Sequence, residues 1–239
     1  MSNLPTLATG PVQLPGTINR DTIVFIDAEV SPETGKIVDL GACRPDGCFF
    51  HSSNVAAFKE FCKGAEYVCG HNIVAFDMQY LRPVLGDGPQ PVDTLPLSAL
   101  LFPRKRFHKL LKDEKLLTDE LNNPLSDARK AMALFEEEVA AFNELPGVLQ
   151  RLFCAMLKNR PEFAGFFRCL NVQTPTFADP AGVIKRLMAD RLCIHADLDG
   201  LAKRRPAELA YALAFIRAAE PADVIPPWVN TNYPATQAV

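Results

Sequence analysis

The chain has 239 residues, of which 48% are hydrophobic and 22% charged, and its formal net charge is −3 at pH 7. No apolar run approaches the roughly 18 residues that a membrane-spanning helix needs, and the first residues lack both a basic start and an apolar core. We therefore expect no membrane span and no secretory signal. The seven cysteines are scattered without a Cys-x-x-Cys pair, which favours free thiols in the cytoplasm over disulfides or zinc ligands.

Apolar runs bounded by turn residues predict five strands after a Pro-, Gly- and Thr-rich start. These strands are expected at residues 22–27, 37–43, 48–52, 67–70 and 91–94. The first three follow one another closely, with Arg44-Pro45-Asp46-Gly47 as the turn between the second and third. Consecutive strands with tight connections predict an antiparallel meander.

Apolar residues at helical spacing predict helices between and after these strands. One is expected over 55–62, one after Asn72 as its N-cap, and one over 95–101. Asn123-Pro124 is a good helix opening, with Asn as the cap and Pro at the first helical position, and this helix should end near Leu145. The alternation of elements predicts an α/β fold with a mixed five-stranded sheet flanked by helices.

Beyond Pro146 the strand signals fade and the sequence predicts a helical extension. Its helices are expected over residues 147–158, 161–171, 180–193 and 206–219. The predicted organisation is a flexible tail (1–19), the α/β domain (20–145), the helical extension (146–220) and a Pro-rich tail or linker (221–239).

Acidic residues recur at three points of the predicted fold. Asp27 and Glu29 are one residue apart on the first strand, and alternate strand residues share a face. Asp77 and Asp127 lie near predicted helix N-termini, where a carboxylate is favoured. Each acid alone is typical of a solvated strand or helix end. Together they form a set of hard oxygen ligands that suits Mg²⁺ or Mn²⁺.

The three acidic segments resemble the motifs of the DEDD superfamily of 3′–5′ exonucleases, which have an RNase H-like fold. The matching strings are "DAE" at residues 27–29, "GHNIVAFD" at 70–77 and "NNPLSDA" at 122–128. More closely, these strings, together with "LLFPRKRFHKLLKDEKL" at 100–116, resemble the exonuclease-type domain at the N-terminus of some bacterial RecQ-like helicases. A helical segment and a "PPW" stretch, here at residues 226–228, follow in those proteins.

This resemblance implies a two-metal nuclease that acts on the 3′ end of DNA, single-stranded or frayed, in DNA repair. By it, Asp27, Glu29 and Asp127 would ligate one Mg²⁺ or Mn²⁺, Asp27 would bridge to a second ion, and Asp77 would hold that ion through water. Two such ions, about 4 Å apart, activate the attacking water and stabilise the leaving oxygen. The resemblance also implies a helicase as partner, in the same or a neighbouring chain.

The sequence departs from this family at the general base. One branch of the family has a His five residues before the last acid, and the other has a Tyr four before it. Asn122 and Asn123 occupy these positions, and neither accepts a proton near neutral pH. Asn122 is thus the vacant base position, or an ordinary loop residue before a cap. His108 is either a substitute base or a surface residue of a basic segment, and His71 is expected to orient the turn before Asn72.

A basic segment, residues 104–109 together with Lys112, precedes the third motif and is the densest positive run of the chain. Either it is a solvated helix face, or it holds the phosphates of a bound strand beside the acids, with the ring of Phe107 stacked on a base. Residues assigned to nucleic-acid binding on the second interpretation are Arg104, Lys105, Arg106, Phe107, Lys109, Lys112 and Asn72.

Two hypotheses of function follow from these observations. The first is a metal-dependent 3′–5′ exonuclease, slowed by the missing base. The second is an exonuclease-fold module with weak or no catalysis that binds nucleic acid or docks a partner such as a helicase. Retention of all four acids favours the enzyme, because converging carboxylates repel each other when no metal is bound.

Overall fold

The computed structural model describes residues 19–110, 123–172, 179–188, 191–193 and 195–219. After a short 3₁₀ turn, η1 (Arg20–Thr22), five strands form one sheet: β1 (Ile23–Val30), β2 (Ile37–Cys43), β3 (Phe49–His51), β4 (Tyr67–Gly70) and β5 (Gln90–Asp93). Their order is β3-β2-β1-β4-β5. The β1–β2 and β2–β3 pairs are antiparallel, whereas β4 pairs with β1 and β5 with β4 in parallel. The predicted mixed sheet and its initial meander are confirmed.

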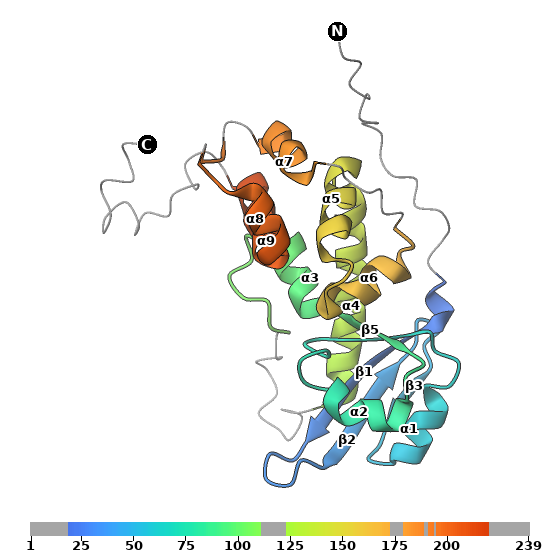
Figure 1. Cartoon of the computed structure of the whole chain (residues 1–239). Helices are drawn as coiled ribbons and strands as arrows, with labels where there is room; N and C mark the ends of the chain where they lie inside the picture. Colours follow the sequence, from blue (N-terminus) through green and yellow to red (C-terminus); the bar gives the residue numbers. More distant parts are fainter. Residues whose placement is uncertain (1–18, 111–122, 173–178, 189–190, 194, 220–239) are drawn as a thin grey trace.

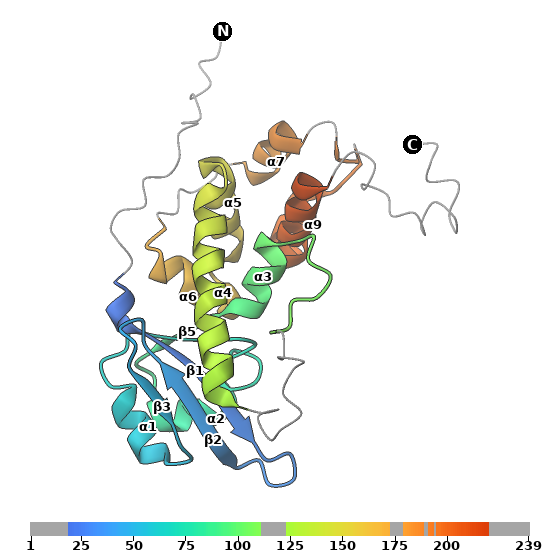
Figure 2. The same cartoon turned by 180° about the vertical axis from the view of Figure 1, so that it is seen from behind.

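Helices cover both faces of this sheet. Helices α1 (Val55–Phe61) and α2 (Met78–Leu85) lie on one face, where Phe58 and Leu81 pack on Ile26 and other alternate residues of β1 and β2. The long helix α4 (Pro124–Glu144) crosses the opposite face, as the two views show (Figures 1 and 2). The two faces of β1 are therefore both buried in its first half, which explains the continuous apolar run at its start.

The helical extension packs around α4 beyond the sheet (Figure 1). It consists of α5 (Gly147–Leu157), α6 (Pro161–Cys169), α7 (Pro180–Met188), α8 (Leu198–Arg204) and α9 (Pro206–Ala218), and it also contacts α3 (Thr94–Leu101). One hydrophobic cluster runs from the sheet through α4 into these helices. A Cβ at Gly165 of α6 would overlap the carbonyl of Pro91, so the lack of a side chain lets α6 cover the edge strand β5.

Several predicted boundaries are confirmed and others are wrong. Strands β2 and β4 have the predicted limits, and α4 begins at Pro124 with Asn123 as its cap. The helix predicted to begin after Asn72 begins instead at Met78, and Asn72 has a positive φ of 63°. Helix α7 ends at Met188, short of the predicted 193, and α8 is not predicted at all. No helix among the described residues is long and apolar enough to cross a membrane.

Candidate functional site

Asp27 and Glu29 of β1 face the side of the sheet that α4 covers. Asp27 pairs with Gly41 of β2, and directly opposed residues of an antiparallel pair share a face. A Cβ at Gly41 would overlap the backbone of Pro124 and Leu125 at the start of α4. Because Gly41 has no side chain, the N-terminus of α4 approaches the strand that carries the two acids.

Asp77 reaches the same strand from the residue before α2. Its Oδ1 accepts a hydrogen bond of 3.2 Å from the backbone N–H of Ala28, the residue between Asp27 and Glu29. Asp77 is only 4% exposed. This burial raises its pKa to about 7, helped by the negative charges of Asp93 and Glu29 and opposed by the Ala28 N–H. The second-motif acid therefore lies against the peptide that joins the two first-motif acids.

Asp127 lies in the first turn of α4, as predicted. Asn123 caps this helix by accepting a 3.0 Å hydrogen bond from Ser126 N–H. Lys130, one turn further along, places its Nζ 3.4 Å from Asp127 Oδ1. The Asp127 carboxylate also acts on His71 at the end of β4, where it raises the imidazole pKa against the dominant lowering by burial. Asp127 is thus within electrostatic reach of the second motif.

Asp93, at the end of β5, holds the loop that carries the second motif. Its Oδ1 accepts hydrogen bonds from Asn72 N–H (2.8 Å) and Leu95 N–H (3.0 Å), and its Oδ2 accepts one from Val74 N–H (3.0 Å). These bonds fix the turn of residues 71–77, here called the second-motif loop. With Asn72 held in this turn at a positive φ of 63°, the helix does not begin there, because an N-cap residue is extended. Sequence reasoning missed this role, although an Asp between a strand and a helix is a readable cap.

The two histidines near the acids are both anchored to α3. His71 Nδ1 lies 2.9 Å from Thr94 Oγ1, and the Thr94 hydroxyl donates to the carbonyl of Gly70 (3.3 Å), which supports the expected orienting role of His71. The Nε2 of His71 is buried and has no hydrogen bond within the described residues. His108 Nδ1 lies 2.9 Å from Ser98 Oγ. Burial lowers the pKa of both imidazoles.

The basic segment, residues 104–109, folds against α3 and α4. With α4 it encloses a cavity of about 570 Å³, here called the basic cavity, whose cations are Lys105, Arg106, Lys109 and Lys130. Phe107 lines this cavity and is 79% exposed. Arg104 Nη1 donates to the carbonyl of Ala218 at the end of α9 (3.2 Å), which ties the segment to the helical extension. Lys130 connects this cavity to Asp127.

Two predicted residues, Asn122 and Lys112, lie outside the described residues. The vacant base position is therefore not placed by the structure. Its neighbour Asn123 is the helix cap, with its side-chain oxygen engaged by Ser126 N–H.

The donor set has the right chemistry for a hard divalent cation, but it is not assembled as a ligand group. Within residues 19–110, 123–172 and the shorter described stretches, no group of three or more His, Cys, Asp or Glu side chains is arranged to hold a metal ion. The backbone contacts at Ala28 and Gly41 nevertheless bring all three motifs to one end of β1. Four carboxylates on these elements fit Mg²⁺ or Mn²⁺ by ligand type, and their oxygens would have to turn toward one another to coordinate it.

A further acid lies beside the first motif and was not predicted. Asp39 of β2 is the register partner of Glu29. Its Oδ2 lies 2.8 Å from Nε2 of His51 on β3. The alternation of β2 and its register place Asp39 on the same face as Glu29. Reading this pair from the sequence requires the strand register, which single motifs do not give.

In comparisons with known proteins, no family model matches the chain, and neither a curated protein nor a solved structure resembles it at a significant level. The resemblance to DEDD exonucleases therefore rests on the three motifs and on the elements that carry them.

Proposed function

We propose that this chain is a metal-dependent nuclease that removes nucleotides from the 3′ end of a DNA strand, single-stranded or frayed. We further propose that it works in the cytoplasm with a helicase, in the same or a neighbouring chain. The observation that carries the proposal is the contact of the Asp77 carboxylate with the peptide of Ala28. This contact joins two motifs that are 49 residues apart, at the point where the start of α4 brings the third.

Asp27, Glu29, Asp77 and Asp127 would hold the metal ions that the reaction needs. When bound, such ions supply an activated water and stabilise the charge that develops on the leaving 3′-oxygen. The residues of the chain do the rest. The Ala28 N–H orients Asp77, the cap at Asn123 fixes the turn that carries Asp127, and Lys130 offsets the negative charge of Asp127.

The basic cavity provides the complementary surface for the strand. One of its four cations, Lys130, has its Nζ 3.4 Å from Asp127 Oδ1, so a phosphate bound beside Lys130 would be close to that acid. The exposed ring of Phe107 can stack on a base without regard to its identity. Because the whole chain is acidic, this local positive charge is the feature that favours a polyanion.

A second candidate function is supported by the lack of an assembled ligand group among the described residues. On this reading the same surfaces bind a strand or dock a helicase, and hydrolysis is slow or absent. The missing His or Tyr at residues 122 and 123 is consistent with it. The two functions make the same prediction for binding and opposite predictions for cleavage.

The test is incubation of a 5′-labelled single strand with the protein and Mn²⁺ or Mg²⁺. The nuclease should shorten the strand from its 3′ end in single-nucleotide steps, and a strand blocked at the 3′ end should persist. Glu29→Gln removes one carboxylate charge and should slow cleavage by at least about a hundredfold, because it weakens the binding of the metal ions that would stabilise the transition state.

Glu33→Gln is the matched control, since Glu33 is an exposed acid in the turn after the same strand. It should leave cleavage unchanged. Strand binding without shortening by wild-type protein in either metal would favour the second function. An RNA strand of the same sequence, run in parallel, decides between DNA and RNA as substrate.

A further inference from the structure

A second cavity lies between the second-motif loop, α3 and the helical extension. Its volume is about 440 Å³, within the range of small-molecule sites. Val74, Leu95 and Ala99 contribute apolar walls on the side of the α/β domain, and Tyr211 of α9 contributes an aromatic wall on the side of the extension. We call it the apolar cavity.

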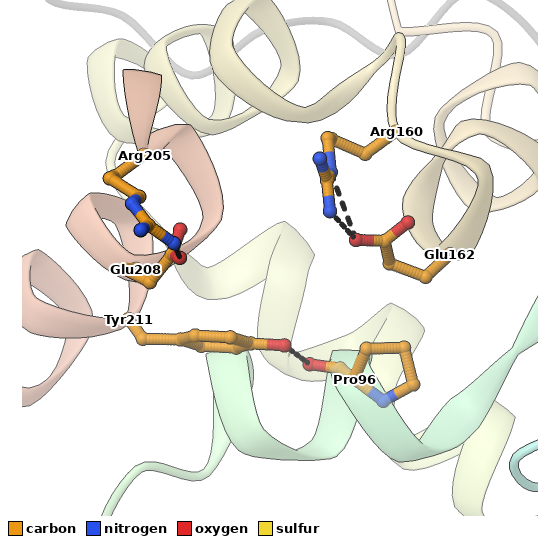
Figure 3. A network of polar contacts seen from close by, with 6 residues as sticks. All are labelled: Pro96, Arg160, Glu162, Arg205, Glu208 and Tyr211. Carbon is orange, nitrogen blue, oxygen red and sulfur yellow. Dashed lines mark hydrogen bonds and ion pairs between the residues drawn. The ribbon is translucent and has the colours of Figure 1, made fainter. Parts of the chain in front are cut away.

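The aromatic wall is held in place by its surroundings. The Tyr211 hydroxyl donates to the carbonyl of Pro96 in α3 (3.3 Å), and its ring centroid lies 6.1 Å from that of Phe163. Figure 3 shows Tyr211 reaching across to Pro96, with the Arg160–Glu162 pair facing it from the neighbouring segment. A fixed aromatic ring beside aliphatic walls suits a flat, apolar-faced ligand.

Three polar groups at this cavity have unused hydrogen-bonding capacity. The Asn72 side-chain amide has no hydrogen bond to any residue that the structure describes. Glu162 uses Oε1 for both bonds from Arg160, at 2.9 and 3.0 Å, and its Oε2 has no partner in the described part of the chain. His108 uses Nδ1 for Ser98, which leaves its Nε2 available. A few polar groups on apolar walls are the usual design of a site that orients a small ligand.

The charges of the two cavities differ. No lysine or arginine in the described ranges lines the apolar cavity, whereas four line the basic cavity. His108 lines both, so the two cavities meet at that residue. A ligand with a charged phosphate and a neutral heterocycle would therefore place its phosphate in the basic cavity and its heterocycle beside Tyr211.

We propose that the apolar cavity receives the nucleobase of the 3′-terminal nucleotide, and that Glu162 Oε2 accepts a hydrogen bond from its exocyclic amino group. The part of this inference that concerns the 3′ end of a strand rests on the proposed nuclease function. It assigns the helical extension a part in base recognition. Adenine, cytosine and guanine carry an amino group and thymine does not, so thymine should bind at least about tenfold more weakly.

The probes are the four deoxynucleoside 5′-monophosphates, observed by saturation-transfer NMR with the whole chain and without metal. The base protons of dAMP, dCMP and dGMP should receive more saturation than the sugar protons. Ala99→Phe fills the cavity and should abolish this transfer. Ala56→Phe adds the same ring on the exposed side of α1 and should not affect it. Ala99→Leu is the smaller change if phenylalanine destabilises the protein, and it should weaken binding at least tenfold.

Glu162→Gln tests the hydrogen bond. The preference for amino-bearing bases over thymine should fall below about twofold, because an amide can turn either an acceptor or a donor toward the base. Equal saturation in wild type and both Ala99 variants, or no saturation of base protons in wild type, would overturn the proposal.

Cleavage of a strand ending in each of the four bases separates this proposal from the proposed function. If the protein cleaves, but its rate changes neither with the Ala99 substitutions nor with the terminal base, the proposed nuclease function stands and the role of the apolar cavity is refuted. Inactive protein that still binds the monophosphates through the cavity would refute the nuclease alone.

Discussion

Two regions bury carboxylates in opposite ways. At the carboxyl ends of the parallel strands, Asp93 is 3% exposed and accepts three backbone hydrogen bonds, and Asp77 accepts one from Ala28. In the middle of α4, Glu138 is 0% exposed, and neither of its carboxyl oxygens has a hydrogen bond to a described residue. Burial raises the pKa of all three acids.

The difference follows from the backbone. Strand ends and helix starts leave N–H groups without partners in the regular structure, and these donors can stabilise a carboxylate. In the middle of a helix every N–H is bonded to the carbonyl four residues earlier, so Glu138 finds no donor there. A buried acid therefore points to a site only when the backbone positions it. The following changes test that distinction.

The largest expected effect concerns the pH dependence of Asp77 in metal-free protein. Its pKa is about 7 in the folded chain and 3.8 in the reference state, so the wild type loses stability as the pH rises between these values. The full shift corresponds to a loss on the order of 4 kcal/mol. Asp77→Asn keeps an oxygen for Ala28 N–H without the charge. In urea unfolding with a chelator present, the free energy of unfolding of the variant relative to that of the wild type should increase by that amount from pH 4 to pH 8.

Asp46→Asn is the matched control for this titration. The Cys48 N–H lowers the pKa of Asp46 in its exposed turn, so ionisation of Asp46 stabilises the folded chain. The stability of the variant relative to the wild type should therefore fall as the pH rises. Adding Mn²⁺ should then raise the melting temperature of the wild type more than that of Asp77→Asn, because the variant lacks one of the four acids that would hold the ions. An equal metal-induced shift in both proteins would place the ion elsewhere.

Asp93→Ala should be the next largest change. It leaves three backbone N–H groups without their acceptor, and each unsatisfied buried donor costs about 1–3 kcal/mol. We expect a loss of at least about 3 kcal/mol in urea unfolding. Asp197→Ala, which removes a cap with one backbone N–H partner and an exposed ion pair with Arg204, should lose about 1 kcal/mol. Equal losses in the two variants would mean that the second-motif loop does not depend on Asp93.

Glu138→Gln should have the opposite sign. The pKa of Glu138 lies well above 4.5, so ionisation at neutral pH opposes folding, and the wild type should lose stability as pH rises above 4.5. We expect the variant to be more stable by about 2 kcal/mol at pH 7, and the gain to disappear near pH 4. Glu137→Gln, on the neighbouring exposed residue, should change stability by less than about 0.5 kcal/mol at either pH. A destabilised Glu138→Gln would show that the carboxylate has a partner that maintains it.

Local patterns in the sequence predicted much of the fold. The limits of β2 and β4 and the cap of α4 at Asn123 agree with the structure because they depend on neighbouring residues alone. The start of α2 was wrong because Asn72 has a positive φ of 63° instead of the extended conformation of an N-cap, in a turn that Asp93, from another strand, binds through the Asn72 and Val74 N–H groups. A competing contact of that kind has no local signature.

The candidate site also has one part that the sequence predicted and one part that it did not. Residue type and order were enough to single out Asp27, Glu29, Asp77 and Asp127 as a set. Their approach depends on strand register and on the missing side chain of Gly41, which a motif does not contain. The anchoring of His108 to Ser98 and the cavity that joins Tyr211 to the second-motif loop come from residues far apart in the chain.

The smallest expected effect on stability concerns Asn123, which caps the helix that carries both Asp127 and Glu138. Asn123→Ala removes the acceptor of Ser126 N–H and should lower stability by about 1 kcal/mol, whereas Asn123→Ser keeps an acceptor and should lose less. Because Asp127 lies in the first turn, loosening of that turn should also slow strand cleavage, by less than about tenfold, and Asn123→Ser should restore most of it. Single-turnover cleavage and urea unfolding on the three proteins measure both effects. A loss of a hundredfold or more that serine does not restore, with stability lowered equally in both variants, would show that Asn123 acts on the reacting strand itself. Asn123, at the position where one branch of the DEDD exonucleases has a tyrosine, would then have a chemical role and not only a structural one.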